Sequence, residues 1–148
     1  MLLIGTRNRT AQTVEAGSPL LVGDVYRRYC KKNNCGVPAF STSLSSIVAQ
    51  HGGIYHVTAN ITFTAPVAGV ITFQLTQDGV AIPGAIASET ITTATTETRT
   101  TTIDFFVLVN NDCILNTPAT IGSNIGVSNT GTLAATVTNY VLNVEKSV

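Results

Sequence analysis

The sequence predicts an all-β protein, a jelly-roll sandwich of eight to ten antiparallel strands, and three observations support this fold class. First, β-branched Thr, Val and Ile are abundant, and these residues lose side-chain freedom in helices but pack well on pleated sheets. Second, apolar and polar residues alternate from Tyr55 to Phe63, as they do in a half-buried strand. Third, turn residues recur about every 8–12 positions, and no convincing helical periodicity interrupts them.

The chain has 148 residues, which is enough for one hydrophobic core and too few for two. Residues 1–19 are mostly polar, so we expect an extended N-terminal docking arm, followed by a jelly-roll domain over residues 20–148. The first predicted strand runs from Leu20 to Tyr29, and Cys30 to Pro38 is a predicted loop. Residues 41–50 fit either one helical turn or a short strand.

The middle of the chain contains the clearest strands. A second alternating strand runs from Ile71 to Leu75, and Asp78-Gly79 then predicts a tight hairpin, because both central positions of that turn need a positive φ. Two short strands should follow, from Val80 to Ile82 and from Ile86 to Thr93. The alternation predicts a core of Tyr55, Val57, Ile61, Phe63, Ile71, Phe73 and Leu75, with Phe105 and Val107 opposite.

The segment from Arg99 to Val109 is predicted to be a strand that is apolar on both faces. Ile103 and Val107 share one face, whereas Phe106 and Leu108 lie on the other. A strand that is apolar on both faces is normally buried on both. Because a small sandwich has no second layer of its own to cover the outer face, we expect a neighbouring subunit to cover it.

Three further strands complete the sequence prediction. They are Ile114-Leu115, Ile121 to Val127 and Leu133 to Val144. The last of these changes its apolar parity near Asn139, which predicts a β-bulge. The residues predicted to form the interface with neighbouring subunits are Phe106, Leu108, Tyr140 and Leu142.

Charged residues make up only 11% of the chain and the net charge is zero, but the charges are unevenly placed. Residues 1–35 carry a net charge of +4, and residues 36–148 carry a net charge of −4. A basic arm of this kind should dock on an acidic protein surface. It lacks the dense basic clusters with interleaved aromatics that a nucleic-acid groove has, so we expect no nucleic-acid partner. The residues predicted to dock are Arg7, Arg9, Arg27 and Arg28.

No pattern typical of an active site occurs in the sequence. The acidic residues are scattered singly, and neither His51 nor His56 has a ligand spacing to the cysteines. The spacing of Cys30, Cys35 and Cys113 is compatible with free thiols, with a disulfide between the first two, and with part of a metal site. We expect no enzymatic activity, no cofactor and no metal.

The start of the chain does not have the pattern of a secretion signal. Met1 to Ile4 is apolar but far shorter than the roughly 7–15 apolar residues of a signal peptide, and its basic residues follow rather than precede it. No apolar run approaches the ~20 residues of a membrane span. We therefore expect synthesis in the cytoplasm without a signal peptide, and no membrane partner.

One stretch of sequence carries a family resemblance. Phe63-Thr64-Ala65-Pro66 is an aromatic-x-x-Pro strand end, Gly69 precedes a strand in which Phe73 follows an apolar residue by two, and Asp78-Gly79 supplies a hairpin. This pattern resembles the central signature of the tumour necrosis factor and complement globular-head jelly rolls. Ile71 stands where the family commonly has Tyr, as in bacterial and phage relatives such as the heads of collagen-like spore-surface proteins. The resemblance implies a homotrimer that is not an enzyme.

The N-terminal segment carries a second resemblance. Thr10 to Gly17, leading into Leu20 to Gly23, is similar to the start of small structural proteins in tailed phages of Firmicutes. Together the resemblances imply a phage virion structural protein on the virion surface, a trimeric capsid decoration or head-fibre module whose N-terminal arm binds the major capsid protein or another virion protein. The alternative is a receptor-binding adhesin or tail-tip module that contacts a host surface glycan or protein.

Overall fold

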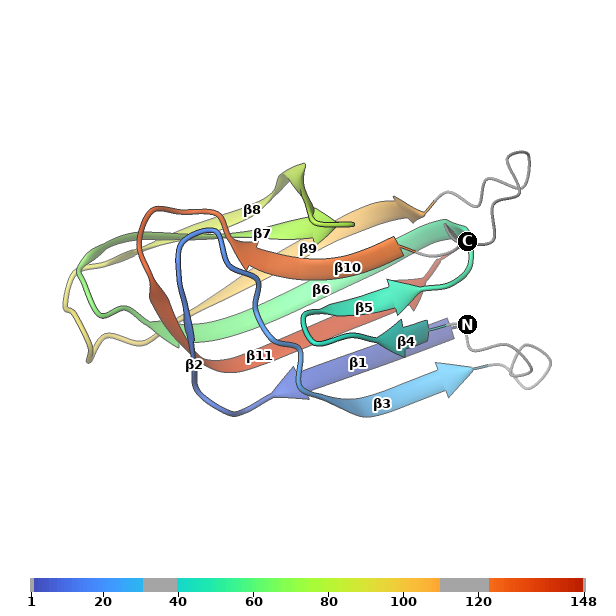
Figure 1. The fold of residues 1–148 in the computed structure, drawn as a ribbon, viewed down its shortest axis with the longest axis horizontal. Coiled ribbons are helices and arrows are strands. Elements are labelled where there is room, and N and C mark those ends of the chain that lie inside the picture. Colours follow the sequence, from blue (N-terminus) through green and yellow to red (C-terminus); the bar gives the residue numbers. More distant parts are fainter. Residues whose placement is uncertain (1, 31–39, 110–122, 148) are drawn as a thin grey trace.

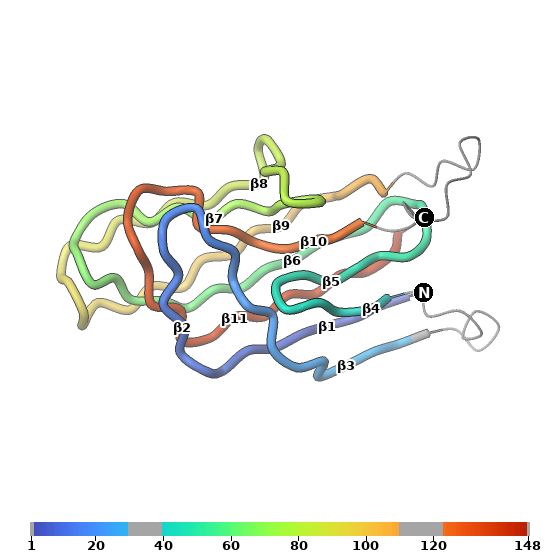
Figure 2. Tube along the Cα trace, in the orientation of Figure 1, coloured from blue at the N-terminus to red at the C-terminus, as the bar shows by residue number. Residues whose placement is uncertain are grey.

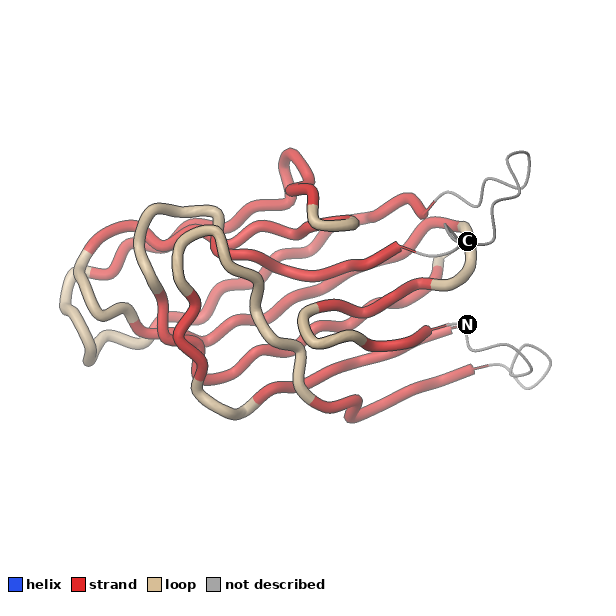
Figure 3. Tube along the Cα trace, in the orientation of Figure 1, coloured by secondary structure: helices blue, strands red, loops and turns tan. Residues whose placement is uncertain are grey.

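The computed structural model describes residues 2–30, 40–109 and 123–147 and shows a sandwich of two antiparallel β-sheets (Figure 1). These ranges contain strands and loops but no helix (Figure 3). The six-stranded sheet has the order β3-β1-β11-β6-β9, with β2 also paired to β11, and the five-stranded sheet has the order β4-β5-β10-β7-β8. The strands are β1 (Leu2–Asn8), β2 (Gln12–Val14), β3 (Asp24–Cys30), β4 (Phe40–Thr42), β5 (Ser46–Ala49), β6 (Gly53–Thr64), β7 (Gly69–Gln77), β8 (Val80–Ile91), β9 (Arg99–Val109), β10 (Ser123–Asn129) and β11 (Ala135–Lys146).

The predicted core lies between the two sheets. All seven residues predicted on β6 and β7 are fully buried, which confirms the alternation. Phe63 of β6 and Phe73 of β7 meet edge to face across the sandwich, with ring centroids 5.1 Å apart. The predicted position of β9 was wrong, because β9 pairs with β6 in the same sheet and does not lie opposite it. Val107 is buried as expected, whereas Phe105 is half-buried.

The predicted hairpin at Asp78-Gly79 is confirmed. Asp78 has a φ of 53° and Gly79 a φ of 81°, as the tight turn between β7 and β8 requires. The two strands predicted after it are one, because β8 continues through Pro83-Gly84. The pairing of β7 with β8 changes register between Gln74 and Thr76, and this irregularity accommodates the Pro-Gly pair without ending the strand.

The N-terminal segment is not an arm. Strand β1 lies inside the six-stranded sheet, paired with β3 on one side and β11 on the other. Leu2 and Ile4 are buried in the core, and Val14 of β2 is buried as well. The prediction of a separate docking segment over residues 1–19 was therefore wrong over residues 2–19. The short apolar alternation of β1 is stabilised by β11, which lies more than a hundred residues away in the sequence, and by the nearby β3.

The remaining predictions have mixed outcomes. Residues 41–50 form extended structure in β4 and β5 and no helical turn. The first predicted strand begins at Asp24 and not at Leu20, and the strand predicted from Ile121 is β10, from Ser123. The predicted strand Ile114-Leu115 and the loop residues 31–38 lie outside the described residues.

Both chain ends lie at the same end of the sandwich (Figure 2). This follows from the pairing of β1 with β11, in which Leu2 is opposite Lys146.

Candidate interaction surfaces

Tyr26 lies between two arginines on the outer face of the six-stranded sheet. Cζ of Arg7 is 5.4 Å from the centroid of the Tyr26 ring, and Cζ of Arg27 is 5.5 Å from it. Both distances are within the range of cation–π attraction. The Tyr26 hydroxyl donates a hydrogen bond to Oδ1 of Asn143 on β11 at 2.7 Å, so the ring lies across β1. We call Arg7, Arg9, Tyr26 and Arg27 the arginine–tyrosine cluster.

Local backbone structure positions this cluster. The register of β1 and β3 shifts beside Gly5, which pairs with Arg27 while Thr6 pairs with Val25, so Tyr26 is the extra residue of a bulge. A Cβ atom on Gly5 would lie 2.7 Å from Cε1 of the Tyr26 ring. Glycine is therefore the residue that lets the ring lie over β1. The sequence analysis did not single out Tyr26. Its position between Val25 and Arg27 in a predicted strand could have indicated an aromatic side chain beside a basic one.

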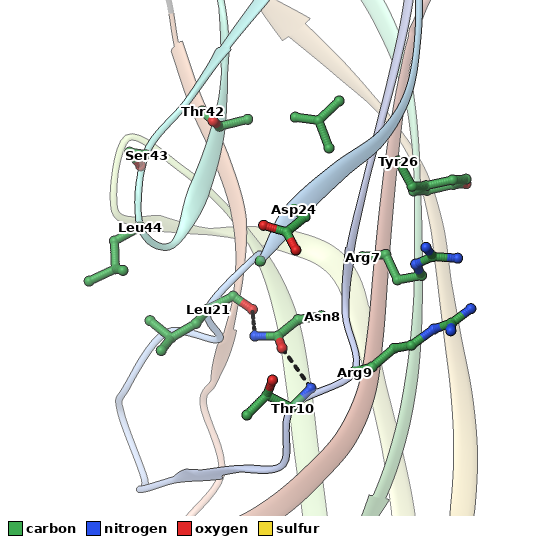
Figure 4. Close-up of a pocket in the computed structure, with 12 residues that line it drawn as sticks. Arg7, Asn8, Arg9, Thr10, Leu21, Asp24, Tyr26, Thr42, Ser43 and Leu44 are labelled. Atoms are coloured by element: carbon green, nitrogen blue, oxygen red, sulfur yellow. Dashed lines mark hydrogen bonds between the residues drawn. The ribbon is translucent and has the colours of Figure 1, made fainter.

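The four arginines predicted to dock lie on two faces of one sheet border. Arg7 is on β1, and Arg9 follows that strand and projects to the same side as Arg7 (Figure 4). Arg27 pairs with Gly5 on the outer face, whereas Arg28 pairs with Ile4, whose side chain points into the core. Arg28 therefore lies on the inner side of β3. All four arginines are exposed.

A groove of about 750 Å³ lies beside this border, between the six-stranded sheet and the turn that joins β4 to β5 (Figure 4). Its lining includes Val25, Leu21 and Leu44, and Leu44 is 77% exposed. Asn8 Nδ2 donates to the Leu21 carbonyl oxygen at 3.0 Å. The Leu21 amide donates to Oε1 of Gln12 at 2.8 Å. These side chains hold the loop before β3 in place.

A second surface lies at the opposite border of the same sheet, on β6 and β9. Phe106 is 60% exposed and Leu108 is 58% exposed. The register places Leu108 opposite Ile54 and Phe106 opposite His56. We call Ile54, His56, Phe106 and Leu108 the apolar patch. The contiguity of these side chains sets the patch apart from the single exposed apolar residues that any protein surface carries.

The rest of the predicted trimer interface does not belong to this surface. Tyr140 and Leu142 are fully buried between the sheets, so their assignment to the interface was wrong. The predicted bulge in β11 is confirmed by the register shift between Val137 and Asn139. The extra residue of the bulge brings Val137 and Tyr140 to the same inward face, although they are three positions apart. Burial also raises the pKa of the Tyr140 hydroxyl far above its ordinary value.

The described residues show no constellation typical of metal chemistry. No group of three or more His, Cys, Asp or Glu side chains in these ranges has the arrangement of a metal site. Cys35 and Cys113 lie outside the described ranges, so the alternatives for the cysteines stay open. The described part of the chain contains no apolar helix of the length that a membrane crossing requires.

Solved structures with the same arrangement of strands span nearly the whole chain. The globular domain of zebrafish complement 1qA protein has a TM-score of 0.61 and 8% identity, over 100% of this chain and 98% of that one. The Eiger TNF from S. frugiperda has a TM-score of 0.58 and 13% identity, over 99% and 94%. The PRD1 vertex protein P5 has a TM-score of 0.53 and 12% identity, over 97% and 93%.

The chain has the TNF/C1q-like jelly-roll fold. Sequence identities this low show a shared fold and no more. No protein-family model matches the sequence, and no curated protein matches it. The resemblance seen in the segment around Phe63 to Gly79 is thus confirmed for the fold.

Proposed function

We propose that this chain is a non-enzymatic head module that assembles as a homotrimer through the apolar patch. The observation that carries the proposal is the exposure of Phe106 and Leu108 side by side with Ile54 on one sheet face. Burying large apolar side chains between subunits stabilises an assembly by ~25 cal/mol per Å² of apolar surface removed from water. The TNF/C1q-like fold supports the same assembly, because the family that the sequence resembles forms homotrimers.

The stoichiometry can be measured directly. Light scattering on the purified full chain at micromolar concentration should give three times the mass of one chain. A stable monomer at that concentration would contradict the proposed assembly.

We further propose that the module belongs to a phage virion and decorates the capsid or forms a head fibre. The likeness to the PRD1 vertex protein P5 supports a virion position, and so does the resemblance of the N-terminal segment to phage structural proteins. The corrected fold changes how attachment would work. The arginines predicted to dock lie on a folded sheet border, so attachment would use that border and not a flexible arm.

Electron microscopy of particles labelled with an antibody against the chain tests the virion role. Label on the capsid surface is the expected result. Label confined to the tail tip would favour the adhesin, and particles that contain none of the chain would contradict both virion roles.

A further inference from the structure

Strand β3 is an edge strand, and none of its residues from Asp24 to Tyr29 is fully buried. It lies at the border of its sheet, and among the described residues it pairs only with β1 (Figure 1). Every residue from Asp24 to Tyr29 is exposed, including Val25 at 39% and Tyr29 at 55%. A strand normally buries at least one face, and an exposed edge with apolar and aromatic side chains is a template for another strand.

The two faces of β3 differ in what surrounds them. On the outer face, Tyr26 and Arg27 lie beside Arg7, so positive charge and an aromatic surface occur together. On the inner face, Val25 lines the apolar part of the groove with Leu21 and Leu44, and the same groove continues past Asp24 to Arg7 and Tyr26. A strand added beside β3 would place alternate side chains next to the arginines and Tyr26 on the outer face and next to the groove on the inner face.

We propose that β3 binds an extended acidic segment of a partner protein, which adds to the sheet as a further antiparallel or parallel strand. This deepens the attachment part of the proposed function by naming the chemistry of the partner. Charge complementarity identifies the partner as acidic, because Arg27 and Arg28 are adjacent on the edge strand and Asp24 is the only acidic residue within β3. Adjacent strand residues point to opposite faces, so the partner needs neighbouring acidic residues, one for each arginine.

The rest of the segment follows from the groove. Beside Val25, an apolar side chain on the inner face would contact Leu21 and Leu44 and remove their surface from water. The backbone of the segment would pair with the edge of β3 that faces away from β1, as in other cases of strand addition. The pattern is therefore an acidic pair next to an alternation of apolar and small polar residues.

A capped synthetic peptide of about ten residues, with a Glu-Glu pair flanked by alternating Val and Thr, is a suitable probe. Its binding to the full chain is measured by fluorescence anisotropy. We expect saturable binding that weakens as salt rises, because the charge pairs are exposed. The R27Q/R28Q variant should bind about tenfold more weakly. The matched control V80E/T90E lowers the net charge by the same amount on exposed residues of β8 and should bind as the wild type does.

A second peptide separates strand addition from charge attraction. The same Glu-Glu sequence with methylated backbone nitrogens keeps its charges but cannot donate the backbone hydrogen bonds of a strand. Loss of binding by this peptide supports strand addition, and equal binding by both peptides overturns it. Binding of a sulfated polysaccharide such as heparin without binding of the Glu-Glu peptide also overturns the proposal. An unchanged affinity of the R27Q/R28Q variant for the Glu-Glu peptide would overturn the proposal as well.

These results are independent of the head-module proposal. The mass of the wild-type chain in light scattering tests the trimer, and microscopy tests the virion position. A trimer on virions that binds none of the acidic peptides would remove only the inference about β3.

Discussion

The imidazole of His56 stacks on the ring of Phe106, with ring centroids 5.0 Å apart and planes 28° from parallel. Nε2 of the same imidazole forms a hydrogen bond with Oδ1 of Asp104 on the adjacent strand. The hydrogen bond orients the imidazole, and the stack holds Phe106 against β6 although most of its surface is exposed. A preorganised aromatic residue of this kind is typical of the centre of a subunit interface.

Replacing Phe106 by Asp should therefore dissociate the proposed trimer. A carboxylate in the apolar patch would lose its water on assembly without gaining a partner, and this loss is unfavourable. We expect the mass from light scattering to fall to that of one chain, with an unchanged far-UV circular dichroism spectrum. Val80→Asp is the matched control, because Val80 is 70% exposed on β8, in the other sheet. A Phe106→Asp variant that remains trimeric would place the interface elsewhere.

Two isoleucines on neighbouring strands test the core. Ile71 is fully buried on β7, whereas Ile86 on β8 is 51% exposed. Ile71→Ala should lower the free energy of unfolding by about 2–5 kcal/mol, because it removes buried surface and leaves a cavity. Ile86→Ala should lower it by less than about 1 kcal/mol. Urea unfolding of both variants at one protein concentration measures the difference, and equal losses would show that the faces of the five-stranded sheet are wrongly assigned.

Deletion of residues 1–8 should unfold the chain. Strand β1 pairs with both β3 and β11, and its removal would leave β3 without a partner and expose the edge of β11. We expect loss of the cooperative thermal transition. The double variant R7S/R9S should keep that transition, because both side chains are exposed. A deletion variant that melts like the wild type would restore the idea of a separate N-terminal arm.

Glu97 should make the loop between β8 and β9 sensitive to acid. Its carboxylate accepts hydrogen bonds from the amides of Thr93 and Thr92, at 2.9 and 2.6 Å, and from the guanidinium of Arg99. The Thr93 amide contributes most, and together these donors lower the pKa of Glu97 from 4.5 to about 2. Because this folded-state pKa lies below that of the unfolded chain, the stabilisation is present above pH 4.5 and is lost as the pH falls through about 2.

The Glu97→Gln variant should therefore have a lower Tm than the wild type at pH 7, and the difference should shrink between pH 4.5 and pH 2. Thermal scans over this pH range measure it. Glu89→Gln removes the same charge from β8 and controls for the change in net charge. A Tm difference that stays constant down to pH 2 would show that the carboxylate charge is not what stabilises the loop.

Local signals in the sequence predicted the elements that depend on few residues. Alternation located the buried face of β6, and the bounds predicted for β9 are the ones observed. The Asp78-Gly79 turn was predictable because its two positive φ angles favour these residue types. Part of the candidate surfaces was predictable for the same reason, since Phe106 and Leu108 could be assigned to the outer face of β9 by parity alone.

Local signals were insufficient where a residue's surroundings come from distant strands. The bulge near Asn139 was predicted, but its effect on Tyr140 was not, because parity does not say which side of a bulged strand faces the core. Tyr26 was missed because its partners Arg7 and Asn143 come from two other strands.

The sequence by itself determined that the chain is all-β, which residues alternate within each long strand, and where the tight hairpin lies, because each of these depends on neighbours a few positions away. Only the tertiary structure decided that β1 lies between β3 and β11, and that Arg7 and Arg27 meet Tyr26 on one face of the sheet. Strand order depends on which edges bury the most surface together, and that comparison involves the whole chain. The N-terminal segment is largely polar and armlike in sequence, yet its residues in β1 and β2 become part of the sheet because β11 is beside them.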